Sequence, residues 1–141
     1  MKKNNILILS AGRRVELVQD FQAEAAKFSD GTKILCTDLN PKMSSACQAA
    51  DGAFAVPRIS APDYIDSIFE LAQAQNIGLI IPTIDTELLK LADARARFAA
   101  AGIQIVVADS ALIRQCRDKR DTIALFERHG ITSPAIYTPY N

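Results

Sequence analysis

Residues 5–14 constrain the fold more than any other part of this sequence, because four consecutive branched apolar residues, 6–9, run directly into a turn of small residues and then into a helical pattern. A strand that is apolar at every position has both faces covered, which is typical of an interior strand of a parallel sheet with helices above and below. The stretch therefore predicts a strand, a tight turn and a helix. In sheets of this type ligands bind in the crevice beyond the carboxyl ends of the strands.

Gly12, Arg13 and Arg14 follow this strand and are the first candidate ligand-binding residues. A glycine lets a bound group approach the backbone closely, and the N-terminus of the next helix offers unpaired N–H groups to an anion. The two arginines add full positive charge beside it. In the alternative interpretation, which the residues leave equally open, Gly12 only makes the turn and both arginines are solvated.

Four further segments have the composition of strands: residues 33–38, 53–56, 77–81 and 103–107. Helical spacing of apolar residues predicts helices between them. The apolar stripe of the first helix is expected to comprise Val18, Phe21, Ala25 and Phe28. Five strands that alternate with helices, with no internal repeat, predict an α/β fold with a Rossmann-like, doubly wound parallel sheet of about five strands.

Asp38 ends the second predicted strand and is the next candidate. Dinucleotide-binding folds place at this point the carboxylate that holds a ribose. Arg14 and Leu17 occupy the places of the second and third glycines of the dinucleotide fingerprint, so a pyrophosphate could not lie against the turn in the usual way. The sequence therefore argues against NAD binding, and we expect Asp38 either to line the crevice or to cap the next short helix.

The loop that follows residues 77–81 forms a second candidate wall of the site, because Thr83, Asp85 and Glu87 bring hydroxyl and carboxylate groups to the carboxyl end of another interior strand. Helix capping is the alternative, since Asp85 is a favourable N-cap residue and Glu87 suits the positive end of a helix. For Asp85 alone the capping role is favoured. The predicted substrate-binding residues are Gly12, Arg13, Arg14, Asp38, Thr83, Asp85 and Glu87.

Charge and cysteine content exclude several classes of partner. The 16 basic residues balance the 16 acidic residues, which argues against a nucleic-acid or membrane partner. The apolar run at the amino end is far too short for a signal peptide or a membrane span. The three cysteines lack the paired spacing of a zinc or redox site, and the chain has one histidine, so no metal site is expected. These features predict a cytoplasmic protein with reduced thiols.

The last part of the chain differs in character from the rest. Asp118 is a favourable N-cap for a helix that Gly130 would end, and residues 131–137 have the composition of the start of a new strand. We therefore divide the chain into a Rossmann-like domain, residues 1–117, and a bridging helix with the start of a further domain, residues 118–141. A strand that starts without partners leads us to expect that the sequence is the front part of a longer protein.

Several short motifs occur in a characteristic order: LSAGRR at 9–14, DLNP at 38–41, AD at 50–51, VP at 56–57, IPTIDTEL at 81–88, DK at 118–119 and HGITSP at 129–134. This ordered set spans almost the whole chain and resembles the amino-terminal region of ATP-grasp proteins. It is most similar to those described as carbamoyl phosphate synthase large subunit-like. In that superfamily a Rossmann-like pre-ATP-grasp domain precedes two domains that clamp ATP and magnesium, and the enzyme joins a carboxylate, activated as an acyl phosphate, to an amine.

The resemblance implies that the parent protein is an ATP-grasp ligase that uses ATP and Mg²⁺, and that this chain has no catalytic residue and is not catalytic alone. The missing clamp makes a C-terminal ATP-grasp domain the implied partner, and tight binding of ATP to this chain is not expected. Lys119 occupies the position of one of the few ATP contacts made from this region. A lysine in the first turn of a helix is disfavoured by the helix dipole, so its placement is easier to explain if it meets an anion. A solvated lysine is the alternative.

Two hypotheses about function stay open. In the first, the chain is the substrate-side domain of such a ligase and helps to bind a small-molecule substrate. In the second, it is a free-standing nucleotide-sensing or protein-interaction module of Rossmann type. Full carbamoyl phosphate synthesis also needs two ATP-grasp units and an ammonia source, so a relative with another substrate fits as well. Domains of this type often form homodimers, but no exposed apolar stripe in the sequence argues for one.

Overall fold

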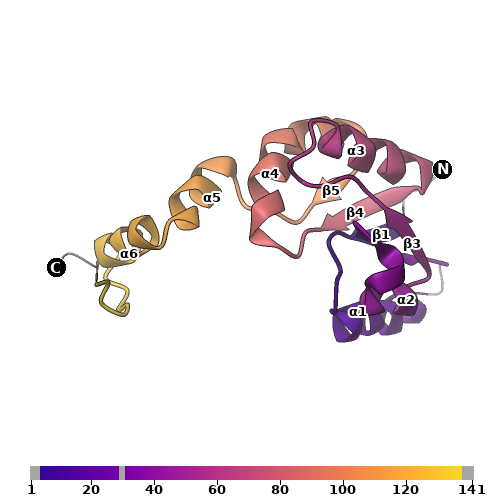
Figure 1. Cartoon of the computed structure of the whole chain (residues 1–141), viewed down its shortest axis with the longest axis horizontal. Helices are drawn as coiled ribbons and strands as arrows, with labels where there is room; N and C mark the ends of the chain where they lie inside the picture. The colour runs from indigo at the N-terminus through magenta and orange to yellow at the C-terminus, as the bar shows by residue number, and fades with distance from the viewer. Residues whose placement is uncertain (1–3, 29–30, 138–141) are drawn as a thin grey trace. The chain divides into compact units, whose positions relative to one another are not determined.

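The computed structural model describes residues 4–28 and 31–137, which form two compact units that divide between Val107 and Ala108. The first unit is built on a five-stranded parallel sheet with the strand order β3-β2-β1-β4-β5 (Figure 1). Its strands are β1 (Asn5–Ile8), β2 (Ile34–Asp38), β3 (Gly52–Ala55), β4 (Ile77–Ile81) and β5 (Gln104–Ile105). This sheet confirms the predicted Rossmann-like α/β fold.

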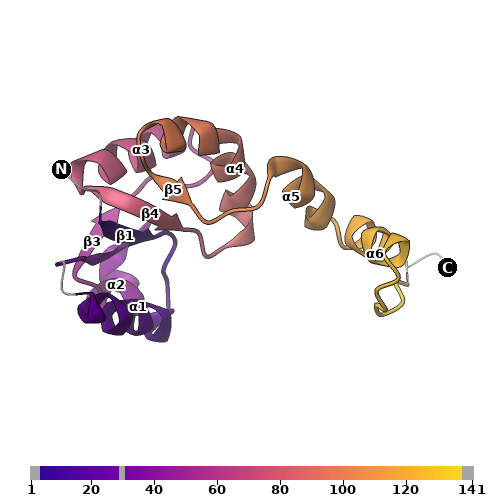
Figure 2. The ribbon, with the colours of Figure 1, turned by 180° about the vertical axis from the view of Figure 1, so that it is seen from behind.

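Helices cover both faces of the sheet. Figure 1 and Figure 2 show α1 (Val15–Lys27) and α2 (Ser45–Ala49) against one face, and α3 (Tyr64–Ala74) and α4 (Asp85–Ala100) against the other. A short 3-10 helix, η1 (Pro41–Met43), precedes α2. The chain therefore leaves β1 toward one face and leaves the neighbouring strand β4 toward the other.

The central strand β1 packs side chains on both of its faces, which explains why residues 6–9 are all apolar. Leu7 belongs to the core between the sheet and α3 and α4, together with Ile68 and Leu91. Ile8 belongs to the core between the sheet and α1 and α2, together with Val18. None of these five side chains has exposed surface. Burial of this apolar surface is the main stabilising contribution to a domain of this kind.

Two features at the edges of this unit differ from the expectation. Phe28 does not join the apolar stripe of α1, because the helix ends at Lys27 and Phe28 is its C-cap residue, with 75% of its surface exposed. The strand predicted over residues 103–107 is shortened to β5, which comprises Gln104–Ile105. Because β5 is an edge strand and pairs with β4 alone among the described residues, it lacks a second strand that would keep the flanking residues extended.

The second unit contains two helices, α5 (Ser110–Arg117) and α6 (Lys119–Arg128). Asp118 is the N-cap of α6 and accepts a hydrogen bond from the backbone N–H of Arg120, which confirms its predicted capping role. Gly130 follows the end of this helix with a φ of 66°, a conformation that glycine adopts without strain.

The strand expected after Gly130 is not formed. Residues 131–137 are irregular, and the sheet of the first unit contains only strands from residues 5–105. Residues 138–141 of the predicted second segment lie outside the described residues. The predicted functional division at residues 117/118 falls between α5 and α6, and it stays a prediction. Within the described ranges, no helix has both the length and the apolar character that a membrane span requires.

Candidate functional site

The strand order places the candidate site at the carboxyl ends of β1 and β4. These strands are hydrogen-bonded neighbours, but α1 and α4, which follow them, lie on opposite faces of the sheet (Figure 1). In open α/β sheets a reversal of this kind leaves a crevice in which ligands bind. The residues that directly follow β1 and β4 are therefore the candidate site, which we call the switch point.

The turn after β1 is held by the last residue of β2 and by a residue that follows this strand. Ser10 and Gly12 both have positive φ values, 50° and 55°, which is uncommon for a residue other than glycine. The N–H of Gly12 donates to Oδ2 of Asp38 across 3.2 Å, and the carbonyl of Gly12 accepts from Oγ of Ser44 across 2.8 Å. The N–H of Gly12 is thus occupied within the protein, and Gly12 serves to make the turn.

Asp38 lies half-buried at the carboxyl end of β2, where it organises the neighbouring backbone. Its Oδ2 holds Gly12, and its Oδ1 accepts a hydrogen bond from the N–H of Asn40 across 3.1 Å. The N-cap residues of the next two helices are Asn40 for η1 and Ser44 for α2. Of the two roles expected for Asp38, capping of the next short helix is therefore wrong, and the role in the crevice stays a prediction. The Asp38 carboxylate instead ties the end of β2 to the turn after β1.

Glu87 is the centre of a buried hydrogen-bond network. Its side chain has no exposed surface. Oε1 accepts from the backbone N–H groups of Thr83 (2.9 Å) and Ile84 (3.3 Å). Oε2 accepts from the hydroxyl groups of Tyr64 (2.9 Å) and Ser10 (3.0 Å). A buried carboxylate is tolerated only when donors satisfy its oxygens in this way. We call these five residues the Glu87 network.

The start of α4 differs from the prediction. The first residue of the helix is Asp85 and its N-cap is Ile84, so the expectation that Asp85 caps the helix is wrong. The physical reason is that Glu87 reaches back to the N–H of Ile84 and satisfies it, which leaves Asp85 exposed at the first helical position. There the negative charge of Asp85 still favours the positive end of the helix dipole.

Tyr64 belongs to this network but was not identified from the sequence. It is the first residue of α3 and is 1% exposed. Burial raises the pKa of Tyr64, and the charge of Glu87 raises it further, so the phenol stays protonated and donates its hydrogen bond. The sequence does indicate locally that a helix starts near Tyr64, because Pro62 precedes it. No local signal could name its partner, which lies 23 positions away.

Arg14 bridges the two loops at the switch point. Its Nη2 donates to the carbonyl of Thr83 across 2.8 Å, and its Nη1 lies 3.5 Å from the carbonyl of Ser10. The hydroxyl of Thr83 lies within hydrogen-bond distance of the carbonyls of Leu9 (2.8 Å) and Ser10 (2.9 Å). The loops after β1 and β4 are therefore tied together by a side chain from each of them.

The structure brings most of the predicted site residues into one set of contacts. Hydrogen bonds at this edge of the sheet involve Gly12, Arg14, Asp38, Thr83 and Glu87. Arg13 and Asp85 are exposed, and their side chains make no hydrogen bond or ion pair with other described residues. The role of all seven residues in substrate binding stays a prediction.

The exposed charges at the switch point set what it can bind. A guanidinium group binds a carboxylate or a phosphate through paired, charge-assisted hydrogen bonds, and the guanidinium groups of Arg13 and Arg14 are exposed. The carboxylate oxygens of Asp38 and Glu87 already accept hydrogen bonds from the protein. Across the described ranges, no group of His, Cys, Asp and Glu side chains could hold a metal ion. The two exposed guanidinium groups therefore suit an anionic group, and ligand binding at the switch point stays a prediction.

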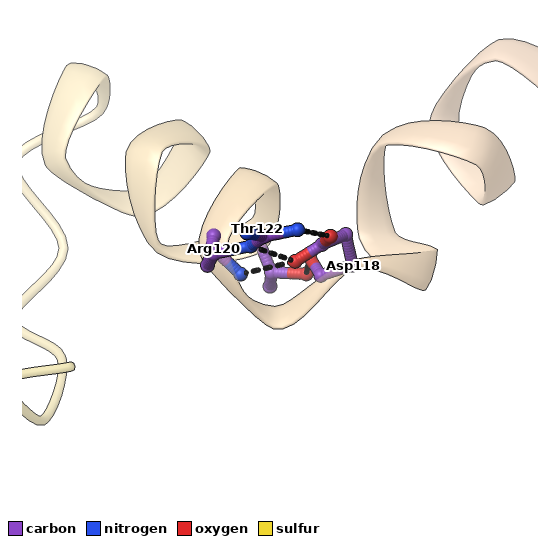
Figure 3. Close-up of polar contacts among 3 residues, drawn as sticks. All are labelled: Asp118, Arg120 and Thr122. Atoms are coloured by element: carbon purple, nitrogen blue, oxygen red, sulfur yellow. Dashed lines mark hydrogen bonds and ion pairs between the residues drawn. The ribbon is translucent and has the colours of Figure 1, made fainter. Parts of the chain in front are cut away.

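The second unit contains Lys119, the predicted ATP contact, at the first position of α6. The adjacent cation, Arg120, is paired with Asp118: its Nη2 lies 2.6 Å from Oδ2 and its Nε lies 3.1 Å from Oδ1 (Figure 3). The hydrogen bond from the Arg120 side chain is the main reason why the pKa of Asp118 is lowered to about 2. Lys119 is exposed and, in the part of the chain that the structure describes, forms no hydrogen bond or ion pair through its side chain.

Short-range hydrogen bonds fix the junction between α5 and α6. The N–H of Thr122 donates to the carbonyl of Asp118 across 2.9 Å (Figure 3). The hydroxyl of Thr122 lies 3.0 Å from the carbonyl of Cys116 and 2.9 Å from that of Asp118. Lys119 is therefore the first residue of a helix whose start is well defined, and its role as an ATP contact stays a prediction.

Comparison with protein families gives one match. Residues 6–106 match the family described as PylC-like, N-terminal domain, so the match covers the sheet except for Asn5, and well over half of the chain. No curated protein sequence matches the chain.

Solved structures share the fold at low sequence identity. The complete multifunctional pyruvate carboxylase from Rhizobium etli is 17% identical, with a TM-score of 0.61 over 94% of this chain and 13% of that one. The biotin carboxylase domain of a single-chain bacterial carboxylase is 24% identical, with a TM-score of 0.59 over 89% and 29%. Glycinamide-RNase-transformylase T from Mycobacterium tuberculosis is 12% identical, with a TM-score of 0.60 over 89% and 35%. This chain thus spans about a third or less of each of these proteins.

Proposed function

Because this chain belongs to the family of PylC-like N-terminal domains, we propose that it acts as the amino-terminal, substrate-side domain of an ATP-grasp ligase. The family match over residues 6–106 carries the proposal. The shared fold supports it, since the three structures compared above are two carboxylases and a transformylase in which the matching region is about a third or less of the chain. The ordered motifs support the finer proposal that the parent is related to the large subunit of carbamoyl phosphate synthase.

The proposed parent joins a carboxylate to an amine in two steps. A carboxylate oxygen bonds to the γ-phosphorus of ATP, and ADP leaves. The amine nitrogen then bonds to the acyl carbon, inorganic phosphate leaves, and the nitrogen gives up a proton. Both steps belong to a C-terminal ATP-grasp domain that binds ATP and Mg²⁺. The proposed role of this chain is to hold a small-molecule substrate. The chain alone is therefore not expected to be catalytic.

We assign substrate binding to the switch point. The exposed guanidinium groups of Arg13 and Arg14 suit an anionic group of the substrate. Thr83 and Asp85 lie in the loop across from them, where the carbonyl of Thr83 contacts Arg14. The contacts between the ends of β1, β2 and β4 support this assignment, because a site of this kind must be held by rigid elements.

We assign the ATP contact of this chain to Lys119, within a bridging segment of residues 118–141. The pairing of Arg120 with Asp118 supports this choice, since Lys119 is then the one of these two adjacent cations whose side chain has no partner among the described residues. A cation in the first turn of α6 is unfavourable by itself, and an anion bound beside it would remove that cost.

Calorimetric titration of ATP with Mg²⁺ into this chain and into the full-length parent tests the proposal. The parent is expected to bind ATP, and to release ADP when a suitable carboxylate and amine are both supplied. This chain alone is expected to bind ATP weakly, because one lysine cannot replace a clamp that encloses the nucleotide. Tight binding by this chain would overturn the proposal and favour a free-standing nucleotide sensor.

A further inference from the structure

We propose that Glu87 is a positioning residue, which fixes the guanidinium group of Arg14 at the switch point and does not contact the substrate itself. The inference rests on the proposed function for the role of Arg14 in binding. The hydrogen bonds that the inference requires can be tested without any ligand. The inference changes the expected role of Glu87 from a residue that contacts the substrate to one that positions Arg14.

The carboxylate of Glu87 is not accessible to a ligand. Its side chain has no exposed surface, and both oxygens already accept hydrogen bonds, two from backbone N–H groups and two from hydroxyl groups. A substrate that reached the carboxylate would have to displace one of these donors. The displaced donor would then be buried without a partner, which is costly.

Glu87 also holds Ser10 in an uncommon backbone conformation. Ser10 has a φ of 50°, which is unfavourable for a residue with a β-carbon. Its hydroxyl donates to Oε2 of Glu87 across 3.0 Å, and its carbonyl lies 2.9 Å from the hydroxyl of Thr83. A residue in such a conformation persists where its surroundings determine it strongly, and such residues gather at functional sites.

The peptide group between Thr83 and Ile84 connects Glu87 to Arg14. The N–H of this peptide group, which belongs to Ile84, donates to Oε1 of Glu87. Its carbonyl, which belongs to Thr83, accepts the hydrogen bond from Nη2 of Arg14 across 2.8 Å. In a planar trans peptide the N–H and the carbonyl point in opposite directions, so the position of the carboxylate on one side sets where the carbonyl lies on the other.

The same carboxylate controls the second carbonyl near Arg14. Nη1 of Arg14 lies 3.5 Å from the carbonyl of Ser10, and Ser10 is bonded to Glu87 through its hydroxyl. Both carbonyls that orient the guanidinium group therefore belong to residues that Glu87 holds. The remaining N–H groups of Arg14 stay available for an anion, and a guanidinium group that is already oriented loses less entropy on binding.

Nitrogen-15 NMR of the arginine side chains tests the inference on the whole 141-residue chain. The Arg14 signals are assigned by their loss in an Arg14→Lys variant. In the unaltered protein, restricted rotation should give Arg14 separate, slowly exchanging Nη–H signals, unlike the solvated Arg13. Glu87→Leu removes both acceptors and should abolish these signals, whereas Glu87→Gln keeps an oxygen for the N–H groups of Thr83 and Ile84 and should retain them.

Tyr64→Phe is the matched control, because it removes a donor to Oε2 but leaves the Thr83–Ile84 peptide bonded to Oε1. It should lower the stability of the protein and still retain the Arg14 signals. Retained signals in Glu87→Leu would overturn the inference, and so would their loss in Tyr64→Phe, which would point to general destabilisation.

If Glu87→Leu does not fold, the unaltered protein provides the test. Couplings across two hydrogen bonds are expected, from the nitrogen of Ile84 to the carboxyl carbon of Glu87 and from Nη2 of Arg14 to the carbonyl carbon of Thr83. The absence of either coupling would overturn the inference. A parent protein without ATP-dependent activity would remove the proposed function but would leave these signals unchanged, so the two failures can be distinguished.

Discussion

The phenolic oxygen of Tyr64 lies 2.9 Å from Oε2 of Glu87, and both side chains are buried. The contact joins the first turn of α3 to the first turn of α4, next to the loops that follow β1 and β4. The hydrogen bonds that Glu87 accepts come from hydroxyl and backbone N–H groups. The charge of this carboxylate is therefore stabilised by neutral donors, each of which should matter to stability.

Tyr64→Phe should lower the free energy of unfolding by about 1–3 kcal/mol, because it removes a hydrogen bond to a buried charged group. Urea denaturation followed by circular dichroism measures the change. Tyr137→Phe is the matched control, since Tyr137 is 85% exposed, and it should leave the stability almost unchanged. Equal stability of the two variants would contradict the importance of the Tyr64–Glu87 contact.

Glu87→Leu should lower the free energy of unfolding by about 3 kcal/mol, because several buried donors lose their acceptor at once. Asp85→Leu alters an exposed acid two positions away on the same helix and should have a smaller effect, since only a favourable charge near the helix N-terminus is lost. Thermal unfolding of the two variants separates these outcomes. A larger loss in the Asp85 variant would show that the negative charge at the helix N-terminus, and not the buried network, dominates.

Asp118 should titrate at unusually low pH. Its pKa is lowered from 3.8 to about 2, mainly by the hydrogen bond from the Arg120 side chain. Because the pKa in the folded protein lies below the ordinary value, the contribution of Asp118 to stability is complete above the ordinary pKa of 3.8 and is lost as the pH falls through about 2. Carbon-13 NMR of the carboxyl group measures the pKa, which should rise toward 3.8 in Arg120→Gln. An unchanged pKa in that variant would contradict the role of Arg120.

Cys116 should react with a thiol reagent in the folded protein while Cys36 and Cys47 do not. Cys116 is exposed, and the other two thiols are buried. Burial raises the pKa of Cys36 to about 12 and also raises the pKa of Cys47, so the reactive thiolate form is scarce at both positions. Ellman's reagent should detect a single fast thiol, which Cys116→Ser removes, and should detect the buried thiols only after denaturation.

If the proposed function is correct, Lys119→Ala in the proposed full-length parent should weaken ATP binding by about ten- to a hundredfold, the equivalent of one charge-assisted hydrogen bond of about 1.5–3 kcal/mol. Arg120→Ala is the matched control and should have a smaller effect, because the Arg120 guanidinium is held by Asp118. Calorimetry measures both affinities. An unchanged affinity in Lys119→Ala would make Lys119 a solvated surface residue.

Much of the fold is determined by local patterns in the sequence. β4 has the predicted bounds, Ile77–Ile81, and Asp118 caps α6 as expected through an N–H two positions further along the chain. Such features depend on a few neighbouring residues, because strand burial, caps and left-handed turns are properties of short segments. The parallel topology also follows from the alternation of strands and helices. It brings the carboxyl ends of the strands to one edge, and this explains why Gly12, Asp38 and Thr83 were expected together.

The roles of the individual side chains were decided only by the tertiary structure. Asp85 and Glu87 are both acids in the first turn of one helix, yet one is exposed and the other is fully buried, because successive helical residues are rotated by about 100°. The partners of Glu87 include Tyr64 and Ser10, which lie 23 and 77 positions away, and Arg14 contacts Thr83 across 69 positions. A hydrogen bond requires its two atoms to lie about 3 Å apart in space, and the sequence determines only their separation along the chain. These pairs therefore exist only once the sheet has brought β1 and β4 side by side.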